Sequence, residues 1–279
     1  MLRQLFNSVF RGIRQRTRAD EAVPADFPVE DLQALRARHE RAPLGLHTRI
    51  LFGDLSVAGT SLLDLYDACM KETDTLVSPW KTFARIQGAA NLAHYFVYSM
   101  NLSGARAECG VFQGFSALFA CRAAALTRGR FSGENFHLID SFEGFPEPQE
   151  KDFIPMRRGL QTVVAPAFSK GDAAVSFEQV RSVFRDFPGV CFHRGFIPQA
   201  LSQLPETHWA FVHIDVDLHD PTLASLEYFY PRMVKDGVIV CDDYGSKLFP
   251  GARKAWETYC QAQGISFVTL ETGQSVLIR

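Results

Sequence analysis

The stretch "AFVHIDVDLHDPTLASLEYFYPRMVKDGVIVCDDYG", residues 210–245, contains two apolar runs and a helical pattern between them. The runs 210–216 and 237–243 predict buried strands, and residues 221–234 predict a helix. This order is typical of two parallel strands joined by a crossover helix. Both runs end in carboxylates, which are Asp215, Asp217, Asp242 and Asp243. Because burying unpaired charge is costly, these acids need a cation, hydrogen bonds or open water.

The same alternation continues along the preceding and following sequence. Three earlier apolar runs predict further strands, at 106–112, 135–140 and 190–195. Three more helices are predicted near 116–127, 174–186 and 251–263. Strands that alternate with helices predict a parallel sheet covered on both faces.

The tail "GISFVTLETGQSVLIR", residues 264–279, contains two strand patterns with no room for a crossover helix. Only a hairpin can join them, so one terminal strand must be antiparallel. This ending is typical of a methyltransferase sheet rather than a dehydrogenase sheet. The predicted fold is therefore α/β: a class I methyltransferase, Rossmann-like, mostly parallel sheet with an antiparallel C-terminal hairpin, plus an N-terminal helical cap.

Three regions are predicted along the chain. Residues 1–20 form a basic amphipathic arm, since residues 1–18 hold five arginines, no acid and apolar residues at helical spacing. The arm could lie on a membrane surface or resemble a transit peptide, or it could pack on its own protein or a second subunit. Residues 21–100 predict a helical cap and linker without strands, and residues 101–279 the methyltransferase domain. Within that domain, 141–173 is a long connection of the kind that is functional or mobile.

The composition is that of an ordinary globular protein, with 279 residues, 47% hydrophobic and 22% charged. A net charge of −2 does not indicate a nucleic-acid partner. The longest uncharged run, 86–105, is too polar for a transmembrane span and predicts a buried helix and turn. The six cysteines are scattered without metal-ligand spacing, which fits a reduced cytoplasmic location.

The end of the first strand of the predicted sheet, "ECGVFQGFS" at 108–116, has the composition of a cofactor loop. Its glycines permit a tight turn and close ligand approach, and the following helix offers free amides. Alone, the two glycines could merely let a strand pack on a helix. The candidate cofactor contacts here are Glu108, Gly110, Val111, Phe112, Gly114 and Ser116.

Asp140 ends the second strand of the predicted sheet, within "LIDSFEGFPEP". An acid at this place accepts hydrogen bonds from ribose hydroxyls in nucleoside cofactors, although it could instead cap a loop. Asp140, the adjacent Ser141 and, at the fourth strand end, Asp215 complete the candidate cofactor set. The order of these features favours a nucleoside-containing cofactor.

The acids at the last two parallel strand ends predict a cation site. Asp215 and Asp217 face the same side if the strand stays extended, and Asp242 and Asp243 end the next strand. Three or four carboxylates would then converge and repel one another without a counter-charge. Oxygen ligands suit Mg²⁺ or Ca²⁺, with Mn²⁺ possible. As alternatives, Asp220 could cap the next helix and Asp243 a turn.

Two histidines accompany these acids. His213 falls inside a strand, where a core histidine with satisfied hydrogen bonds is the simpler interpretation. His219 follows Asp217 in the loop, where it could contact substrate or assist proton transfer.

Four segments together resemble the macrocin O-methyltransferase-type enzymes, which are metal- and S-adenosylmethionine-dependent sugar O-methyltransferases of antibiotic biosynthesis. The similarity covers about residues 80–279, and its segments are "ECGVFQGFS", "LIDSFEGFPEP", "HIDVDLHDPTLASLEYFYPRMVKDGVIVCDDYG" and "PGARKAW".

The resemblance implies metal ligands at Asp215, Asp242 and Asp243, with Asp217 as general base and cofactor contacts at 108–116 and Asp140. It implies S-adenosylmethionine as cofactor, a sugar or glycoside as acceptor, and a homo-oligomer. The chain departs from the family pattern in two places. Its "FQGF" at 112–115 stands where the family commonly has Trp-Arg-Gly-Gly, and His219 replaces a common tyrosine.

Other functions remain open at this point. The same fold could serve a non-catalytic binding or scaffold protein, or a methyltransferase for phenolic, catechol-like acceptors. A nicotinamide oxidoreductase is disfavoured because both G-x-G-x-x-G and Tyr-x-x-x-Lys motifs are absent.

Overall fold

A seven-stranded sheet forms the centre of the computed structural model, which describes residues 56–57, 60–75, 82–158 and 161–279. The strand order is β10-β11-β9-β8-β3-β4-β7. The five strands from β9 to β7 are mutually parallel, and β11 is antiparallel to both of its neighbours. The bounds are β3 Ala105–Cys109, β4 Phe136–Asp140, β7 Val190–Arg194, β8 Trp209–Ile214, β9 Met233–Cys241, β10 Val268–Thr269 and β11 Ser275–Ile278. The predicted parallel sheet with an antiparallel C-terminal hairpin is confirmed.

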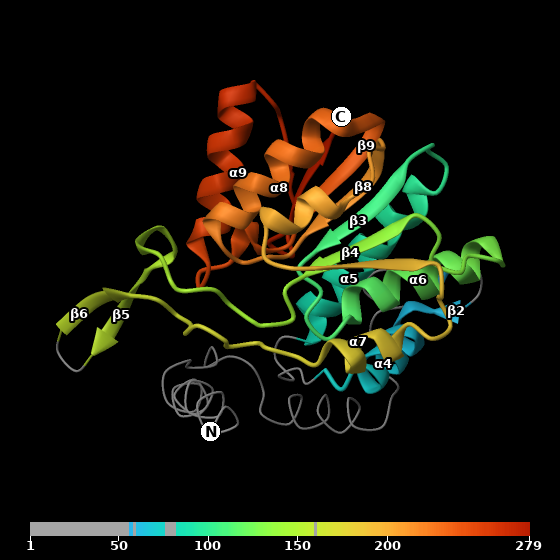
Figure 1. Cartoon of the computed structure of the whole chain (residues 1–279), viewed down its shortest axis with the longest axis horizontal. Helices are drawn as coiled ribbons and strands as arrows, with labels where there is room; N and C mark the ends of the chain where they lie inside the picture. Colours follow the sequence, from blue (N-terminus) through green and yellow to red (C-terminus); the bar gives the residue numbers. More distant parts are fainter. Residues whose placement is uncertain (1–55, 58–59, 76–81, 159–160) are drawn as a thin grey trace, which may run out of the picture. The chain divides into compact units, whose positions relative to one another are not determined.

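Helices cover both faces of this sheet (Figure 1). Helix α8 packs on α9 and β8, whereas α5 packs on α6, β8 and β9. Aromatic side chains fill both layers: Phe229 of α8 meets Trp209, and Phe96 of α5 meets Phe136 and Phe211. The bounds are α4 Leu62–Glu72, α5 Thr82–Ser99, α6 Phe115–Arg128, α7 Phe177–Val183, α8 His219–Phe229 and α9 Pro250–Gln263.

The central strands are buried along their whole length. All residues of β3 and β8 are buried, which fits the mainly apolar sequence of β8, whereas β3 also buries Arg106 and Glu108. The helix and turn expected in the run 86–105 form as α5 and the residues after it. Among the helices that the structure describes, α5 included, we find none with the length and apolar character to cross a bilayer.

Two predictions about secondary structure were wrong. The helix expected over 221–234 ends at Phe229, because Pro231 lacks an amide proton and sits in a short 3-10 turn, Tyr230–Arg232, before β9. A two-residue pair, β1 Ser56–Val57 and β2 Thr60–Ser61, lies in the region predicted to lack strands.

The long connection 141–173 contains a hairpin that its sequence pattern did not reveal. Its antiparallel strands are β5, Ile154–Arg158, and β6, Gln161–Ala165, preceded by a 3-10 turn, Glu150–Asp152. The hairpin extends away from the central sheet (Figure 1). Strands outside a common core need no regular alternation of buried and polar residues, so the pattern is weak.

The predicted division of the chain into three regions stays a prediction. Residues 56–279 form one compact unit. The basic arm at 1–20, its suggested membrane contact and the start of the predicted helical cap lie outside the described residues.

Candidate active site

The predicted acids lie where β8 and β9 end. Backbone hydrogen bonds align the ends of β3, β8 and β9. Asp215 N donates to Cys109 O at 2.8 Å, and Asp242 N donates to Ile214 O at 3.0 Å. Asp215, Asp242 and Asp243 each offer a carboxylate oxygen, and these oxygens lie within 4.8 Å of one another. Three of the four predicted carboxylates therefore converge, and we call these three residues the acid cluster.

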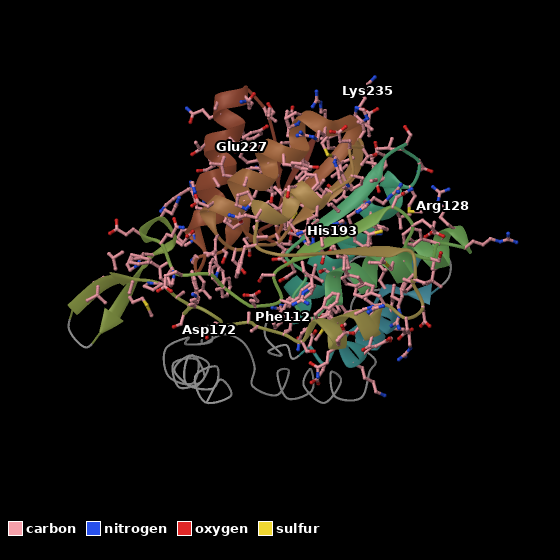
Figure 2. The ribbon with its side chains drawn as sticks, in the orientation of Figure 1. Phe112, Arg128, Asp172, His193, Glu227 and Lys235 are labelled. Carbon is pink, nitrogen blue, oxygen red and sulfur yellow. The ribbon has the colours of Figure 1, made fainter. Side chains whose placement is uncertain are left out.

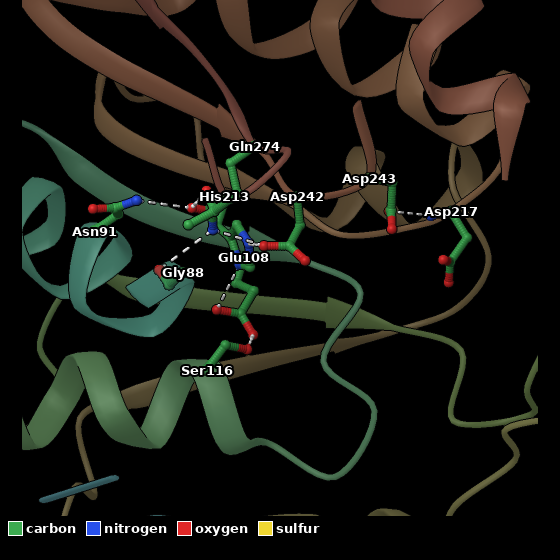
Figure 3. Close-up of polar contacts among 10 residues, drawn as sticks. Gly88, Asn91, Glu108, Ser116, His213, Asp217, Asp242, Asp243 and Gln274 are labelled. Atoms are coloured by element: carbon green, nitrogen blue, oxygen red, sulfur yellow. Dashed lines mark hydrogen bonds and ion pairs between the residues drawn. The ribbon is translucent and has the colours of Figure 1, made fainter. Parts of the chain in front are cut away.

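Asp217 is not one of the three residues whose oxygens converge, although it lies beside Asp243. Strand β8 ends at Ile214, and Asp217 has φ of 60°, so the chain does not stay extended as predicted. Its backbone N donates to Asp243 Oδ2 at 2.8 Å (Figure 3). The loop that carries Asp217 is thus tied to the acid cluster through its backbone, which also accounts for one acceptor of Asp243.

The acid cluster carries strong electrostatic repulsion. Burial raises the pKa of Asp215 and of Asp243 well above the usual range, and neighbouring carboxylates, Asp242 among them, add to both shifts. Burial and then Asp215 raise the pKa of Asp217 to about 8. Two of the cluster's carboxyls therefore resist ionisation in the absence of a positive partner.

Asp242 behaves differently because it has partners. Its side chain is 42% exposed, yet burial of the carboxyl still acts to raise its pKa. The nearby His213, followed by a hydrogen bond from Gln274, outweighs burial and lowers that pKa. Asp242 is the one member of the acid cluster that the protein itself holds in the ionised form.

His213 is the residue that sequence reasoning undervalued. It is 1% exposed, as expected for a core histidine, but neither ring nitrogen has a hydrogen bond from the described residues, so the expectation of satisfied hydrogen bonds was wrong. Its Nδ1 lies 3.2 Å from Glu108 Oε2 and its Nε2 lies 3.7 Å from Asp242 Oδ1 (Figure 3). Although burial lowers the pKa of His213, Asp242 and Glu108 raise it well above its usual value. A useful sequence signal was its position near the end of β8, two residues before Asp215.

Glu108 lies beneath the site rather than at its surface. It is buried, pairs with His213 in the β3–β8 register, and accepts a hydrogen bond from Ser116 Oγ at 2.7 Å. Two predicted cofactor contacts, Glu108 and Ser116, thus bond to each other. They join the start of α6 to the network that reaches Asp242.

Asp140 organises the loops around the predicted cofactor position. Its Oδ2 accepts hydrogen bonds from Val111 N at 2.7 Å and Phe112 N at 2.9 Å, and its Oδ1 accepts one from Phe142 N at 2.7 Å. The adjacent Ser141 Oγ accepts from Glu143 N at 3.1 Å. The loop-capping alternative for Asp140 is therefore realised, and its contact with ribose stays a prediction.

The glycine loop meets the acid cluster directly. Gly110 has φ of 85°, and a Cβ there would lie 1.7 Å from Asp215 O, so only glycine fits. Gly114 has φ of 86° and precedes α6, which begins without a side-chain cap. Phe112 is 43% exposed, and Figure 2 shows it at the opposite end of the sheet from Lys235, which lies in β9. The predicted cofactor loop and the predicted cation ligands thus adjoin at one sheet edge.

His219 is the first residue of α8 rather than a loop residue. Its N donates to Asp152 Oδ1 at 2.8 Å, and its Nδ1 lies 3.0 Å from Asp220 Oδ1. Asp220 does not cap the helix as suggested, because the helix starts one residue earlier and Asp220 pairs instead with Lys151.

Asp152 was missed because it lies in the connection whose pattern was uninformative. It is buried, and a Cβ on Gly251 would lie 1.8 Å from its Oδ1. The glycine of "PGARKAW" therefore lets the start of α9 approach Asp152. This contact joins the connection 141–173 to the starts of α8 and α9.

The strand order, the glycine loop and the acids at the carboxyl edge define the class I methyltransferase fold. The O-methyltransferase NovP has a similar fold, with a TM-score of 0.57 and 23% identity over 70% of this chain and 80% of that one. Calicheamicin methyltransferase CalS11 gives a TM-score of 0.58 and 18% identity over 77% of this chain and 91% of that one. At these identities the likeness concerns the fold.

Sequence comparison identifies the family. The family model described as macrocin-O-methyltransferase (TylF) matches residues 84–271, which is more than half of the chain. The chain belongs to this family, as the resemblance of its four segments indicated.

Two named relatives are similar to part of the chain. One is the 8-demethyl-8-(2,3-dimethoxy-alpha-L-rhamnosyl)-tetracenomycin-C 4'-O-methyltransferase of Streptomyces olivaceus, 29% identical over 61% of this chain and 63% of the relative. The other is the demethyldecarbamoylnovobiocin O-methyltransferase of Streptomyces niveus, 27% identical over 58% of this chain and 60% of the relative. The chain spans about three fifths of the length of these relatives.

Proposed function

We propose that this protein is a metal-dependent O-methyltransferase that moves a methyl group from S-adenosylmethionine to a hydroxyl of a sugar or glycosylated natural product. The observation that carries the proposal is the acid cluster, with three carboxylate oxygens within 4.8 Å, beside the glycine loop. Family membership and the names of the two relatives support the methyl transfer and the kind of acceptor.

The donor atoms of the acid cluster fit a hard divalent cation. Asp215, Asp242 and Asp243 would hold Mg²⁺, with Mn²⁺ or Ca²⁺ as substitutes, because carboxylate oxygens are the ligands these ions prefer. A cation would also relieve the burial and repulsion that raise the pKa of Asp215 and Asp243. Such an ion supplies positive charge that favours loss of a proton from a nearby hydroxyl.

The cofactor would lie along the glycine loop. Gly110, Val111, Phe112 and Gly114 form its turn, and Asp140 holds the amides of Val111 and Phe112 in place. S-adenosylmethionine supplies the methyl group for transfer. The exposed ring of Phe112 and the uncapped start of α6 are the parts of this loop available to a ligand.

The residues of the chain supply the base and the orientation. A sugar hydroxyl is a poor nucleophile near neutral pH, so a base must accept its proton as the new bond forms. Asp217 suits this role, since burial and Asp215 raise its pKa, which makes its ionised form a stronger base, and its backbone is fixed by Asp243. His219 is the rival base. Holding the acceptor oxygen in line with the methyl group is the remaining contribution.

Methyl transfer from labelled S-adenosylmethionine to a panel of glycosides and phenols tests the proposal. We expect glycosides to be methylated, EDTA to abolish transfer, and Mg²⁺ or Mn²⁺ to restore it. Full turnover in exhaustive chelator would contradict the metal, and transfer to phenols alone would contradict the acceptor. A protein that fails to bind S-adenosylmethionine in calorimetry would instead fit a scaffold role.

We further propose that the protein is a homo-oligomer, on the basis of the family resemblance. Sedimentation velocity of the full chain tests this independently of activity. A monomer at micromolar concentration would contradict it.

A further inference from the structure

Gln274 contacts the acid cluster from a distant part of the sequence. It lies immediately before β11 in the C-terminal hairpin, and its side chain is 3% exposed. Its Nε2 donates to Asp242 Oδ1 at 2.8 Å (Figure 3). A buried amide is therefore bonded directly to a candidate cation ligand.

Neighbouring groups fix which way this amide faces. Gln274 Oε1 accepts hydrogen bonds from Thr272 Oγ1 at 2.9 Å and Asn91 Nδ2 at 3.4 Å. Its Nε2 also lies 3.4 Å from Gly88 O. Since the oxygen meets two donors and the nitrogen meets two acceptors, the orientation that satisfies all four contacts directs Nε2 at Asp242.

Gln274 bonds to one oxygen of Asp242, and the part of the chain that the structure describes leaves the other oxygen without a hydrogen bond. The Oδ1 atom receives the Gln274 bond and faces His213 Nε2 at 3.7 Å. No hydrogen bond from the described residues reaches Oδ2. An amide also carries no charge, so it orients the carboxylate without the repulsion that a lysine or arginine would exert on a cation.

We propose that Gln274 is a positioning residue that presents Asp242 Oδ2 to the divalent cation. Through Asn91 and Gly88 it also couples helix α5 and the C-terminal hairpin to the cation site. This inference rests on the cation of the proposed function. It assigns a role to two segments, α5 and the hairpin, that hold none of the candidate cation ligands or the candidate base.

The test compares Mn²⁺ affinity of cation-free protein by electron paramagnetic resonance titration, with no acceptor present. Gln274→Met keeps the length of the side chain and removes its hydrogen bonds. We expect Mn²⁺ binding to weaken by about 10- to 100-fold, the usual effect of removing a group that orients a metal ligand. Gln263→Met is the matched control, because Gln263 is exposed at the end of α9. It should bind Mn²⁺ like the parent.

Two further measurements separate positioning from a general loss of structure. S-adenosylmethionine affinity measured without metal should stay within about twofold of the parent in Gln274→Met. If that variant fails to fold, the double variant Asn91→Ala, Thr272→Val frees the amide without changing Gln274, and it should weaken Mn²⁺ binding by a smaller factor.

The outcomes distinguish the two proposals. A parent protein that binds no Mn²⁺ contradicts the proposed metal dependence itself. A parent that binds Mn²⁺ while Gln274→Met binds it equally well overturns the role of Gln274. Equal losses of Mn²⁺ and cofactor affinity also overturn it, because they indicate general structural damage.

Discussion

Asp140 and the acid cluster occupy the same edge of one sheet but meet the cost of buried charge in opposite ways. Asp140, at the end of β4, accepts hydrogen bonds from three backbone amides, those of Val111, Phe112 and Phe142. In the acid cluster, at the ends of β8 and β9, the carboxylate oxygens lie within 4.8 Å of one another. The first arrangement is complete without a ligand, whereas the second leaves an excess of negative charge.

The difference shows how an acid's role follows from its partners rather than from its position. All four acids follow buried strands, and their sequence contexts look alike. Amides that converge on Asp140 make it an organiser of loops. Within the described residues, too few donors surround Asp215 and Asp243 to offset burial and repulsion, which raise the pKa of both. Because ionisation of these carboxyls is unfavourable without a counter-charge, a cation bound at the acid cluster would stabilise their ionised form.

Replacing Asp217 should give the largest effect, because it removes the proposed base and leaves the acid cluster in place. Asp217→Asn keeps the size of the side chain but removes its basicity. We expect kcat to fall by about 10²–10⁴-fold, the usual contribution of a positioned base. Mn²⁺ affinity should stay near that of the parent, since the three clustered oxygens are retained. Steady-state kinetics and a Mn²⁺ titration on the same preparation measure both effects.

His219→Gln is the control for this assignment. The structure places His219 Nδ1 beside Asp220 and its backbone on Asp152, so we expect a smaller loss of kcat than in Asp217→Asn. Near-parental turnover in Asp217→Asn, together with a large loss in His219→Gln, would transfer the role of base to the histidine.

Replacing Asp140 should have an intermediate effect that acts on the cofactor rather than the cation. Asp140→Ala removes the acceptor that holds the amides of Val111 and Phe112. We expect S-adenosylmethionine binding to weaken by about 1–3 kcal/mol, the usual cost of losing a charge-assisted hydrogen bond. Isothermal titration calorimetry gives this affinity, and Mn²⁺ binding should change little. If Asp140→Ala lowers the melting temperature but leaves cofactor affinity unchanged, Asp140 only caps the loops and does not support cofactor binding.

The smallest effect concerns the pH dependence of the cation-free protein. The pKa of Asp217 is raised from 3.8 to about 8, so between these values the folded state binds more protons than the unfolded state. Stability from this group is therefore lost as pH rises toward 8. Without cation, we expect the melting temperature to fall by a few degrees between pH 6 and 8.5. Each kcal/mol of stability lost corresponds to about 2–4 °C of melting temperature.

Two comparisons sharpen that pH experiment. Asp217→Asn removes the titrating group, so its melting temperature should depend less on pH over the same range. Added Mg²⁺ should raise the melting temperature more at pH 8.5 than at pH 6, because fewer protons then compete with the cation. If the melting temperature of the cation-free parent rises with pH while that of Asp217→Asn does not, the raised pKa of Asp217 is contradicted.

The sheet could be predicted in detail because each of its strands carries a local signal. Buried strands such as β4 and β8 have short, mainly apolar sequences, and the missing crossover in the tail forces an antiparallel hairpin. The acids at the strand ends were equally visible, since parallel strands bring their carboxyl ends to one edge. The β5–β6 hairpin was not visible, because it packs in no common core and its residues need not alternate.

The sequence by itself determined the fold class, the family and the edge of the sheet where the acids gather, since all three follow from local patterns and chain direction. The tertiary structure decided which acids share a ligand position and which side chains hold them. Asp217 has a positive φ and its backbone amide bonds to Asp243, Asp140 accepts hydrogen bonds from three amides, and His213 faces Glu108 and Asp242. Gln274 reaches Asp242 across 32 positions of sequence. Such contacts depend on side-chain direction and on elements far apart in the chain, for which a one-dimensional pattern carries no signal.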